Sequence, residues 1–185
     1  QTKAIYSDGA GSGGKMVDAF ATLNVVDLLV DDDLTVTGDV AVTGDYSSTT
    51  SGTSNLRLGV NAGNSIASGG NYNVVVGDEA GTAITTGDHN VAVGYSALTA
   101  DTLGTGSTAV GRFALGAQNF TTATNAYNTA VGFNAGVSVT TGVQNTLIGG
   151  LAGDALTDAD YNVAIGTDAL HSDTLGSRSL AIGRR

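Results

Sequence analysis

The carboxylates of this chain are the first residues to consider for chemistry, because a glycosidase needs two of them. Acidic side chains cluster near the C-terminal end, at Asp158, Asp160, Asp168 and Asp173. Turn residues of an acidic protein explain them equally well, so their spacing alone does not establish catalysis. No G-x-S-x-G, H-E-x-x-H or P-loop motif occurs in the sequence. We therefore predict that the chain is not an enzyme.

Candidate metal ligands are equally sparse. His89 and His171 occupy different positions of the repeat described below, as expected for turn residues. The run Asp31-Asp32-Asp33 could bind calcium, but no EF-hand spacing or G-G-x-G-x-D motif surrounds it, and a solvated charge cluster is the simpler interpretation. The chain has no cysteine, which excludes disulfides and cysteine metal sites. We expect neither a metal nor a cofactor.

The composition favours an extended, hydrogen-bonded architecture. The 185 residues include 28 glycines and no proline. Proline donates no N–H to a ladder, and glycine permits sharp turns, so this composition suits continuous strand pairing. The net charge of −10 argues against nucleic acid as a partner, because phosphate binding needs lysine and arginine. No run of 18 apolar residues occurs, so we expect no membrane insertion.

A short phrase recurs along the chain and ends each time on a glycine. It reads N-V-A-V-G-Y-S-A at residues 90–97 and N-V-A-I-G-T-D-A at residues 162–169. The anchor glycines are Gly59, Gly77, Gly94, Gly111, Gly132, Gly149, Gly166 and Gly183. They are separated by 18, 17, 17, 21, 17, 17 and 17 residues. A nearly fixed period of this length indicates a stacked solenoid.

The columns of the repeat predict the local structure. Residues one and three before each anchor glycine are aliphatic or threonine, and the residue between them is mostly alanine. This alternation is typical of a strand. Asparagine recurs four residues before the glycine, where stacked amides can form a ladder, and alanine recurs three residues after it, where it marks a tight interior corner. The structural columns include Asn90, Asn128, Asn145, Asn162, Ala97, Ala135, Ala169, Gly94, Gly132 and Gly166.

Each unit is therefore expected to contain a strand, a glycine turn, a short second strand and a threonine–glycine turn. A left-handed hexapeptide β-helix is rejected, because the fifth residue after the glycine is not consistently aliphatic. With one or two aliphatic columns per coil, a monomer would bury little apolar surface against a backbone entropy cost of about 1–2 kcal/mol per residue. We predict an all-β parallel β-solenoid with coils of about 17 residues, in which three chains of a homotrimer share a thin core.

The phrase N-x-A-[VI]-G-x-x-A resembles the head repeats of trimeric autotransporter adhesins, which form left-handed parallel β-rolls. Its 17-residue spacing, with T-x-G between phrases, is similar to repeats of bacteriophage tail-fibre and related virion fibre proteins. The resemblance covers residues 55–185 and implies a structural or receptor-binding fibre protein of a virion. It also leaves open the head of a bacterial cell-surface adhesin and, as a third possibility, a polysaccharide-cleaving fibre.

The N-terminal third does not share the repeat. Residues 1–33 are interpreted as an attachment segment that joins other virion proteins. Residues 34–54 contain two units of the type V-x-V-T-G-D, at 34–39 and 40–45, which are similar to shaft pieces of phage fibres. Residues 55–185 then form the solenoid. Arg184 and Arg185 follow a final unit that keeps the full pattern, and we expect them to lead into further structure.

One unit of the solenoid is longer than the others. The interval from Gly111 to Gly132 has four extra residues, located around residues 118–127. Insertions in solenoids become loops on one face, often the binding face. Asn119, Phe120 and Tyr127 are therefore candidates for contact with a host-surface glycan or protein. The alternative is that Phe120 packs over a neighbouring chain.

Overall fold

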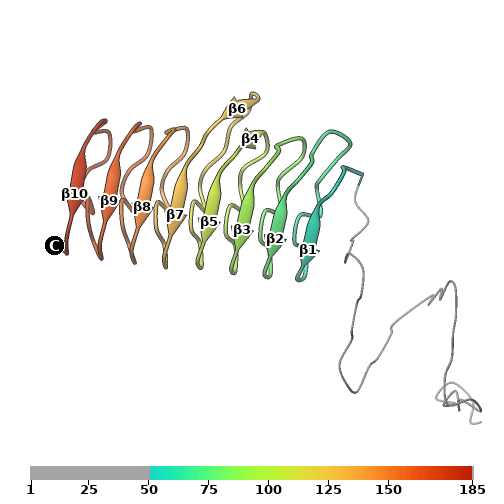
Figure 1. The fold of residues 1–185 in the computed structure, drawn as a ribbon, viewed down its shortest axis with the longest axis horizontal. Helices are drawn as coiled ribbons and strands as arrows, with labels where there is room; N and C mark the ends of the chain where they lie inside the picture. Colours follow the sequence, from blue (N-terminus) through green and yellow to red (C-terminus); the bar gives the residue numbers. More distant parts are fainter. Residues whose placement is uncertain (1–50, 185) are drawn as a thin grey trace, which may run out of the picture. The chain divides into compact units, whose positions relative to one another are not determined.

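The computed structural model describes residues 51–184. These residues form a parallel β-solenoid with coils of about 17 residues and contain no helix, as the sequence predicted (Figure 1). The predicted attachment segment at 1–33, residues 34–50 of the predicted shaft, and Arg185 lie outside the described residues.

Each coil contributes one three-residue strand to a single eight-stranded parallel sheet. The strands are β1 (Leu56–Leu58), β2 (Val74–Val76), β3 (Val91–Val93), β5 (Thr108–Val110), β7 (Thr129–Val131), β8 (Thr146–Ile148), β9 (Val163–Ile165) and β10 (Leu180–Ile182). Their order in the sheet follows the chain, and each repeat position pairs with the same position of the next coil. A second sheet of two strands joins β4 (Gly104–Thr105) to β6 (Thr124–Asn125).

The anchor glycines are required by both backbone conformation and space. Their φ angles lie between 125° and 142°, a region that side chains rarely adopt. A Cβ added to Gly77 would lie 2.8 Å from the carbonyl carbon of Gly94 in the next coil. A side chain here would therefore strain its own backbone and push successive coils apart.

The expected second strand of each unit does not form in the described coils. The second and fourth residues after the anchor glycine lie in the left-handed region, as at Phe113 (φ 54°) and Leu115 (φ 50°). These residues bend the chain sharply, and hydrogen bonds such as Gly116 N to Phe113 O close tight turns. Alternate left-handed residues are incompatible with an extended strand.

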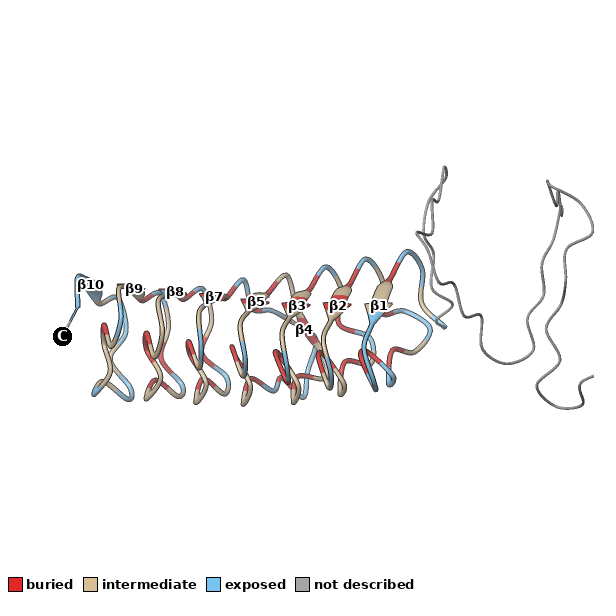
Figure 2. Ribbon diagram, turned by 90° about the horizontal axis from the view of Figure 1, so that it is seen from below, coloured by how far each residue is buried: buried red, intermediate tan, exposed pale blue. Residues whose placement is uncertain are grey.

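The interior of the solenoid is lined by small side chains. The alanine column three residues after the glycine is 0–4% exposed from Ala62 to Ala169, which confirms the predicted interior corner. The middle residue of each strand also points inward, and Ala92, Ala109 and Ala130 are fully buried. Figure 2 shows this buried inner lining running along the coils.

Two kinds of coil fill the remaining interior space. A coil is named here by the anchor glycine at which it begins. In one kind, the fourth residue after that glycine is glycine and the seventh is a buried aliphatic residue. In the other kind, the fourth residue is leucine and the seventh is polar. The glycine–aliphatic pairs are Gly63 with Ile66, Gly81 with Ile84, Gly136 with Val139, and Gly153 with Leu156; the leucine–polar pairs are Leu98 with Asp101, Leu115 with Gln118, and Leu170 with Asp173.

The two positions of a pair compete for one volume. A Cβ on Gly81 would lie 2.8 Å from the Cδ1 atom of Ile84, and a Cβ on Gly153 would lie 2.8 Å from the Cδ1 atom of Leu156. A large side chain therefore fits at one position of the pair or the other, but not at both. The large side chain of each pair therefore helps to fill the interior, and the two aliphatic columns of the strands do not.

Those two columns form an outer stripe and do not fill the interior of the single chain. The outer stripe comprises Leu56, Leu58, Val74, Val76, Val91, Val93, Thr108, Val110, Thr129, Val131, Thr146, Ile148, Val163, Ile165, Leu180 and Ile182. Its side chains are half-buried or exposed, for example 36% at Val131 and 38% at Ile148. Strand alternation was predicted correctly, but the larger side chains face outward and the alanines face inward.

The predicted asparagine ladder is present inside the coils. The Asn73 Oδ1 atom accepts the backbone N–H of Asn90 at 2.9 Å, and the Asn90 Nδ2 atom donates to the carbonyl of Gly104 at 2.8 Å. Asn90, Asn128 and Asn145 are fully buried. Each amide thus joins two coils, and its Nδ2 atom satisfies a buried turn carbonyl of the next coil, as buried polar groups require.

Candidate functional site

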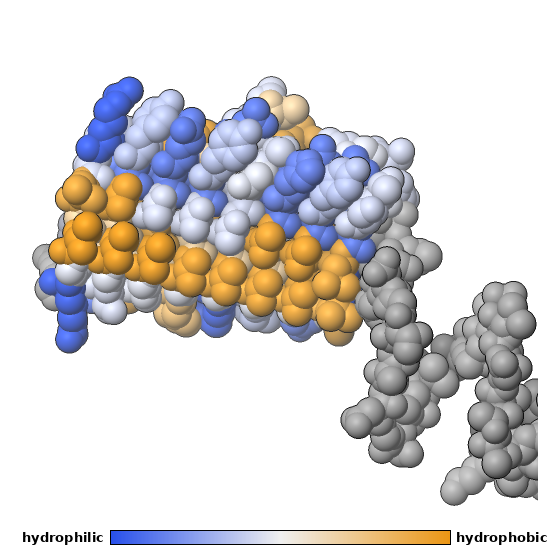
Figure 3. Space-filling view, in the orientation of Figure 1, coloured by the Kyte–Doolittle hydropathy of each residue, from blue (hydrophilic) through white to orange (hydrophobic). Residues whose placement is uncertain are grey.

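The outer stripe is the most extended surface feature of the described residues. Figure 3 shows it as a continuous hydrophobic band along the solenoid. The band arises because every coil places two aliphatic or threonine side chains on the same face of the sheet, in register with the coils on either side. Contiguous exposed apolar surface of this kind marks interaction sites on soluble proteins.

A column of large polar side chains precedes the strands. It lies five residues before the anchor glycines and contains Tyr72, His89, Tyr127, Gln144, Tyr161 and Arg178; Gly106 leaves a gap at this position, and all seven residues have positive φ. Tyr72 and His89 stack at 4.9 Å between ring centroids, and the Arg178 guanidinium lies 5.2 Å from the Tyr161 ring centroid. Figure 3 shows hydrophilic side chains along one edge of the hydrophobic band. The stripe is therefore bordered by planar polar groups.

The candidate contact residues of the longer unit do not share one surface. The β6 region extends beyond the neighbouring coils (Figure 1). Asn119 is exposed and accepts a hydrogen bond from Thr102 Oγ1 at 3.2 Å. Tyr127 is 56% exposed, and a Cβ on Gly106 would lie 2.7 Å from its ring. Phe120 is only 5% exposed, so its ring lies within the chain itself.

A buried polar network closes the break in the asparagine ladder at Ser107. Ser107 occupies the ladder position between Asn90 and Asn128. The Gln118 Nε2 atom donates to Asp101 Oδ2 at 2.6 Å and to Ser107 Oγ at 3.0 Å, while its Oε1 atom accepts from Asn128 Nδ2 at 2.8 Å. The long Gln118 side chain therefore spans the gap that the short serine leaves.

Asp101 is the buried carboxyl group of this network. It is 1% exposed, and its Oδ1 atom accepts the backbone N–H groups of Gly104 at 3.0 Å and Phe120 at 3.1 Å. Burial raises the pKa of Asp101 above its ordinary value, and the hydrogen bonds from Gln118 and the backbone oppose this rise only in part. The sequence signal for this network is the change from a glycine–aliphatic pair to a leucine–polar pair at the fourth and seventh positions of the coil.

A second feature that sequence reasoning missed is an aromatic–arginine patch, comprising Tyr95, Arg112, Phe113 and Phe133. The Arg112 guanidinium lies 4.3 Å from the Phe113 ring centroid, 5.4 Å from that of Phe133 and 5.8 Å from that of Tyr95. The Tyr95 and Phe113 rings meet edge to face at 5.5 Å. Three successive coils contribute to this patch, so their regular stacking positions its side chains.

Three of the carboxylates considered for catalysis accept hydrogen bonds within the solenoid. Asp158 accepts a hydrogen bond from Thr141 Oγ1 at 2.7 Å, and Asp160 accepts the backbone N–H of Val143 at 2.8 Å. Asp173 accepts the backbone N–H of Gly176 at 2.8 Å. Asp158 and Asp160 thus bond to the preceding coil and Asp173 bonds within its own turn, so each of the three carboxylates has a hydrogen-bond partner in the solenoid. Asp168 lines the hollow described next.

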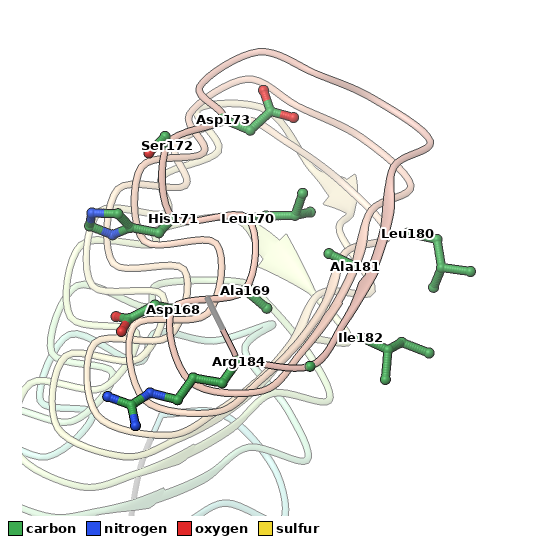
Figure 4. A pocket seen from close by; sticks show the side chains of 11 residues that line it. Asp168, Ala169, Leu170, His171, Ser172, Asp173, Leu180, Ala181, Ile182 and Arg184 are labelled. Carbon is green, nitrogen blue, oxygen red and sulfur yellow. The ribbon is translucent and has the colours of Figure 1, made fainter.

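The hollow lies at the end of the described solenoid and has a volume of about 660 Å³. Ala169, Leu170 and Ala181 point into it, while Leu180 and Ile182 point outward (Figure 4). Nearby, His171 Nδ1 lies 3.0 Å from Asp154 Oδ1. Within residues 51–184, no group of three or more histidine, aspartate or glutamate side chains is placed to hold a metal ion.

Comparison with protein families, with curated proteins and with solved structures found no match to this chain. In the described part of the chain, no helix has the length and apolar character needed to span a membrane. The case for function therefore depends on the surfaces of the solenoid.

Proposed function

We propose that this chain forms the repeat body of a homotrimeric, non-enzymatic fibre of a virion, which serves attachment or builds the appendage itself. The observation that carries the proposal is the outer stripe, which runs through all eight strands of the sheet. A fibre subunit needs one long surface that can meet identical subunits along its whole length, and the stripe has this form.

The stripe suits association between parallel copies of the same chain. Burying a valine, leucine or isoleucine side chain fully contributes about 1.5–3 kcal/mol, and part of this remains to be gained from the half-exposed stripe. The regular coils repeat the stripe at a constant interval, so parallel copies in register match strand for strand. Three such faces can close around one axis and cover all three stripes, which supports the trimer.

The turn carboxylates support a structural role. Asp160 accepts the backbone N–H of Val143 in the preceding coil, and Asp173 accepts that of Gly176 in its own turn, so hydrogen bonding within the solenoid accounts for their positions. The resemblance of the repeat to phage tail-fibre and adhesin-head repeats supports placement on an extracellular particle. In this proposal, the N-terminal third joins the other virion proteins.

The test is the mass of the full chain in solution, measured by light scattering at micromolar concentration. We expect three times the chain mass for the native protein. The double variant V93D/V110D places charges in the stripe and should give a smaller species that retains a β-rich circular dichroism spectrum. The control N64D changes an exposed turn residue away from the stripe and should remain trimeric. A native chain that is monomeric and β-rich would overturn the proposal.

A further inference from the structure

The aromatic–arginine patch is an exposed surface that the outer stripe does not include. Tyr95 is 47% exposed and Phe133 is 51% exposed, and Arg112 is also exposed. Their side chains occupy one column, directly after the anchor glycines of three successive coils. Phe113 lies beneath the guanidinium, 4.3 Å from it. Large rings left open to water on a solenoid lose the stabilisation that burial would provide, which makes them candidates for binding.

The charge of Arg112 is unusual in its surroundings. Its guanidinium makes ring contacts but no hydrogen bond or ion pair with the described residues. The chain has a net charge of −10, yet residues 90–100, 107–118 and 128–139 of these coils contain no aspartate or glutamate. Arg112 is therefore the one charged residue in these three stretches, and the nearest acid in its column, Asp78, lies one coil beyond Tyr95.

A guanidinium stacked on an aromatic ring has a specific recognition geometry. Its face is covered by the ring, and its N–H groups lie along the edge and remain available to an anion. A carboxylate can accept two parallel hydrogen bonds from that edge. The Phe113 ring thus holds Arg112 in place for a carboxylate that approaches along the surface.

The patch remains accessible in the assembly proposed above. Arg184 occupies the same repeat position as Arg112, and Figure 4 shows its side chain directed away from Leu180 and Ile182 of the outer stripe. Because residues at the same repeat position stack along the solenoid, the column that contains Tyr95, Arg112 and Phe133 also faces away from the trimer axis. Formation of the trimer would leave it open to ligand.

We infer that this patch binds an acidic oligosaccharide, whose sugar rings stack on Tyr95 and Phe133 and whose carboxylate pairs with Arg112. Tyr95 and Phe133 are two coils apart, a spacing of roughly 10 Å along the solenoid axis, which matches the first and third of three linked pyranose rings. Flat aromatic faces suit the C–H faces of sugars, and the arginine selects for a carboxylate. The inference rests on the proposed attachment function and deepens it by naming the ligand class.

Calorimetric titration of the full chain tests this inference. The probes are oligogalacturonate, oligosialate and hyaluronan oligosaccharides, and each has its methyl ester as the uncharged counterpart. We expect at least one acidic probe to bind and its ester to bind at least tenfold more weakly. The variants R112Q and F133A should each weaken binding at least tenfold. The control Y161A removes an exposed ring outside the patch and should leave binding unchanged.

The mass of each sample separates this inference from the proposed function. A trimeric native chain that binds none of the acidic probes, or binds acid and ester equally, overturns the ligand assignment and leaves the fibre proposal intact. Unchanged binding in R112Q also overturns the assignment. A monomeric native chain overturns the fibre proposal whatever the titration shows.

Discussion

The coil that begins at Gly77 fills its interior with Ile84, whereas the coil that begins at Gly94 uses Leu98 and directs the carboxyl group of Asp101 inward. The first arrangement is apolar and regular. The second introduces polar groups that need partners, which Gln118 and the backbone of the longer unit supply. Where the core becomes polar between Gly94 and Gly132, the solenoid also departs from its regular form.

The departures occur together in the middle of the solenoid. The coils that begin at Gly94 and Gly111 contain the ladder break at Ser107, the longer unit and the β4–β6 pair. They also carry Tyr95 and Arg112 of the exposed patch. The outer stripe, by contrast, continues through these coils without interruption. We propose that the stripe serves assembly along the whole sheet, while the patch for recognition is centred on the two irregular coils and reaches the next coil at Phe133.

The largest expected effect comes from placing leucine in a coil that already has an aliphatic residue. G81L should lower the free energy of unfolding by about 2–4 kcal/mol per chain, through overpacking against Ile84 and the left-handed backbone. Adding I84A should restore part of this loss, because the coil then resembles the one with Leu98. Urea denaturation of both variants measures the difference. If the double variant is less stable than G81L, the two positions do not share one volume.

Enlarging a residue of the alanine columns should cause the next largest loss of stability. A130L and A135L each enlarge a fully buried side chain and should cost about 1–3 kcal/mol per chain, an effect felt in all three chains of a trimer. N64A, in the exposed turn between Gly63 and Ser68, should change stability by about 0.5 kcal/mol or less. Thermal melting followed by circular dichroism compares them. Equal melting temperatures would show that the alanine columns tolerate bulk and are not closely packed.

A smaller, pH-dependent effect should distinguish the polar coils. The pKa of Asp101 is raised on folding, so the folded chain retains its proton to higher pH than the unfolded chain. The contribution of Asp101 to stability is therefore fully present below the ordinary carboxyl range and declines as pH rises through the raised pKa, by about 1.4 kcal/mol for each unit of pKa difference.

Urea denaturation across this pH range checks the effect, with D101N as the comparison. The variant should lack the decline, since asparagine does not titrate. The slope with pH is the readout, because the absolute stability of D101N also reflects the new amide facing Gln118. An identical slope in the native chain and D101N would assign the pH dependence to other groups.

Much of the solenoid could be predicted because stacking places equivalent residues under the same constraint. The anchor glycines, the Asn90 ladder and the Ala97 column each recur at one position, so the period exposes them. The direction in which the strand faces could not be predicted, because alternation separates two faces without saying which is inside. The choice depends on the interior space left by each coil: Ala92 faces inward in β3, whereas Val75 and Leu147 face inward where glycines at the fourth position leave room.

The candidate sites were harder to predict because they depend on differences between coils. Phe120 was predicted as a possible contact residue, yet the longer unit folds its ring inward, where it is 5% exposed. The aromatic–arginine patch was missed because its members belong to different repeats and become neighbours only through stacking. Comparison of adjacent repeats at a single position would have aligned Tyr95, Arg112 and Phe133.

The central claim, that the outer stripe joins parallel chains in register, is tested most directly by spin-label distances. The chain has no cysteine, so V76C in β2 and I165C in β9 provide single labelling sites five strands apart, roughly 24 Å along the axis. Double electron–electron resonance on each labelled variant should give one short distance between chains, similar for both sites. The absence of dipolar coupling, or a long distance at either site, would contradict the account.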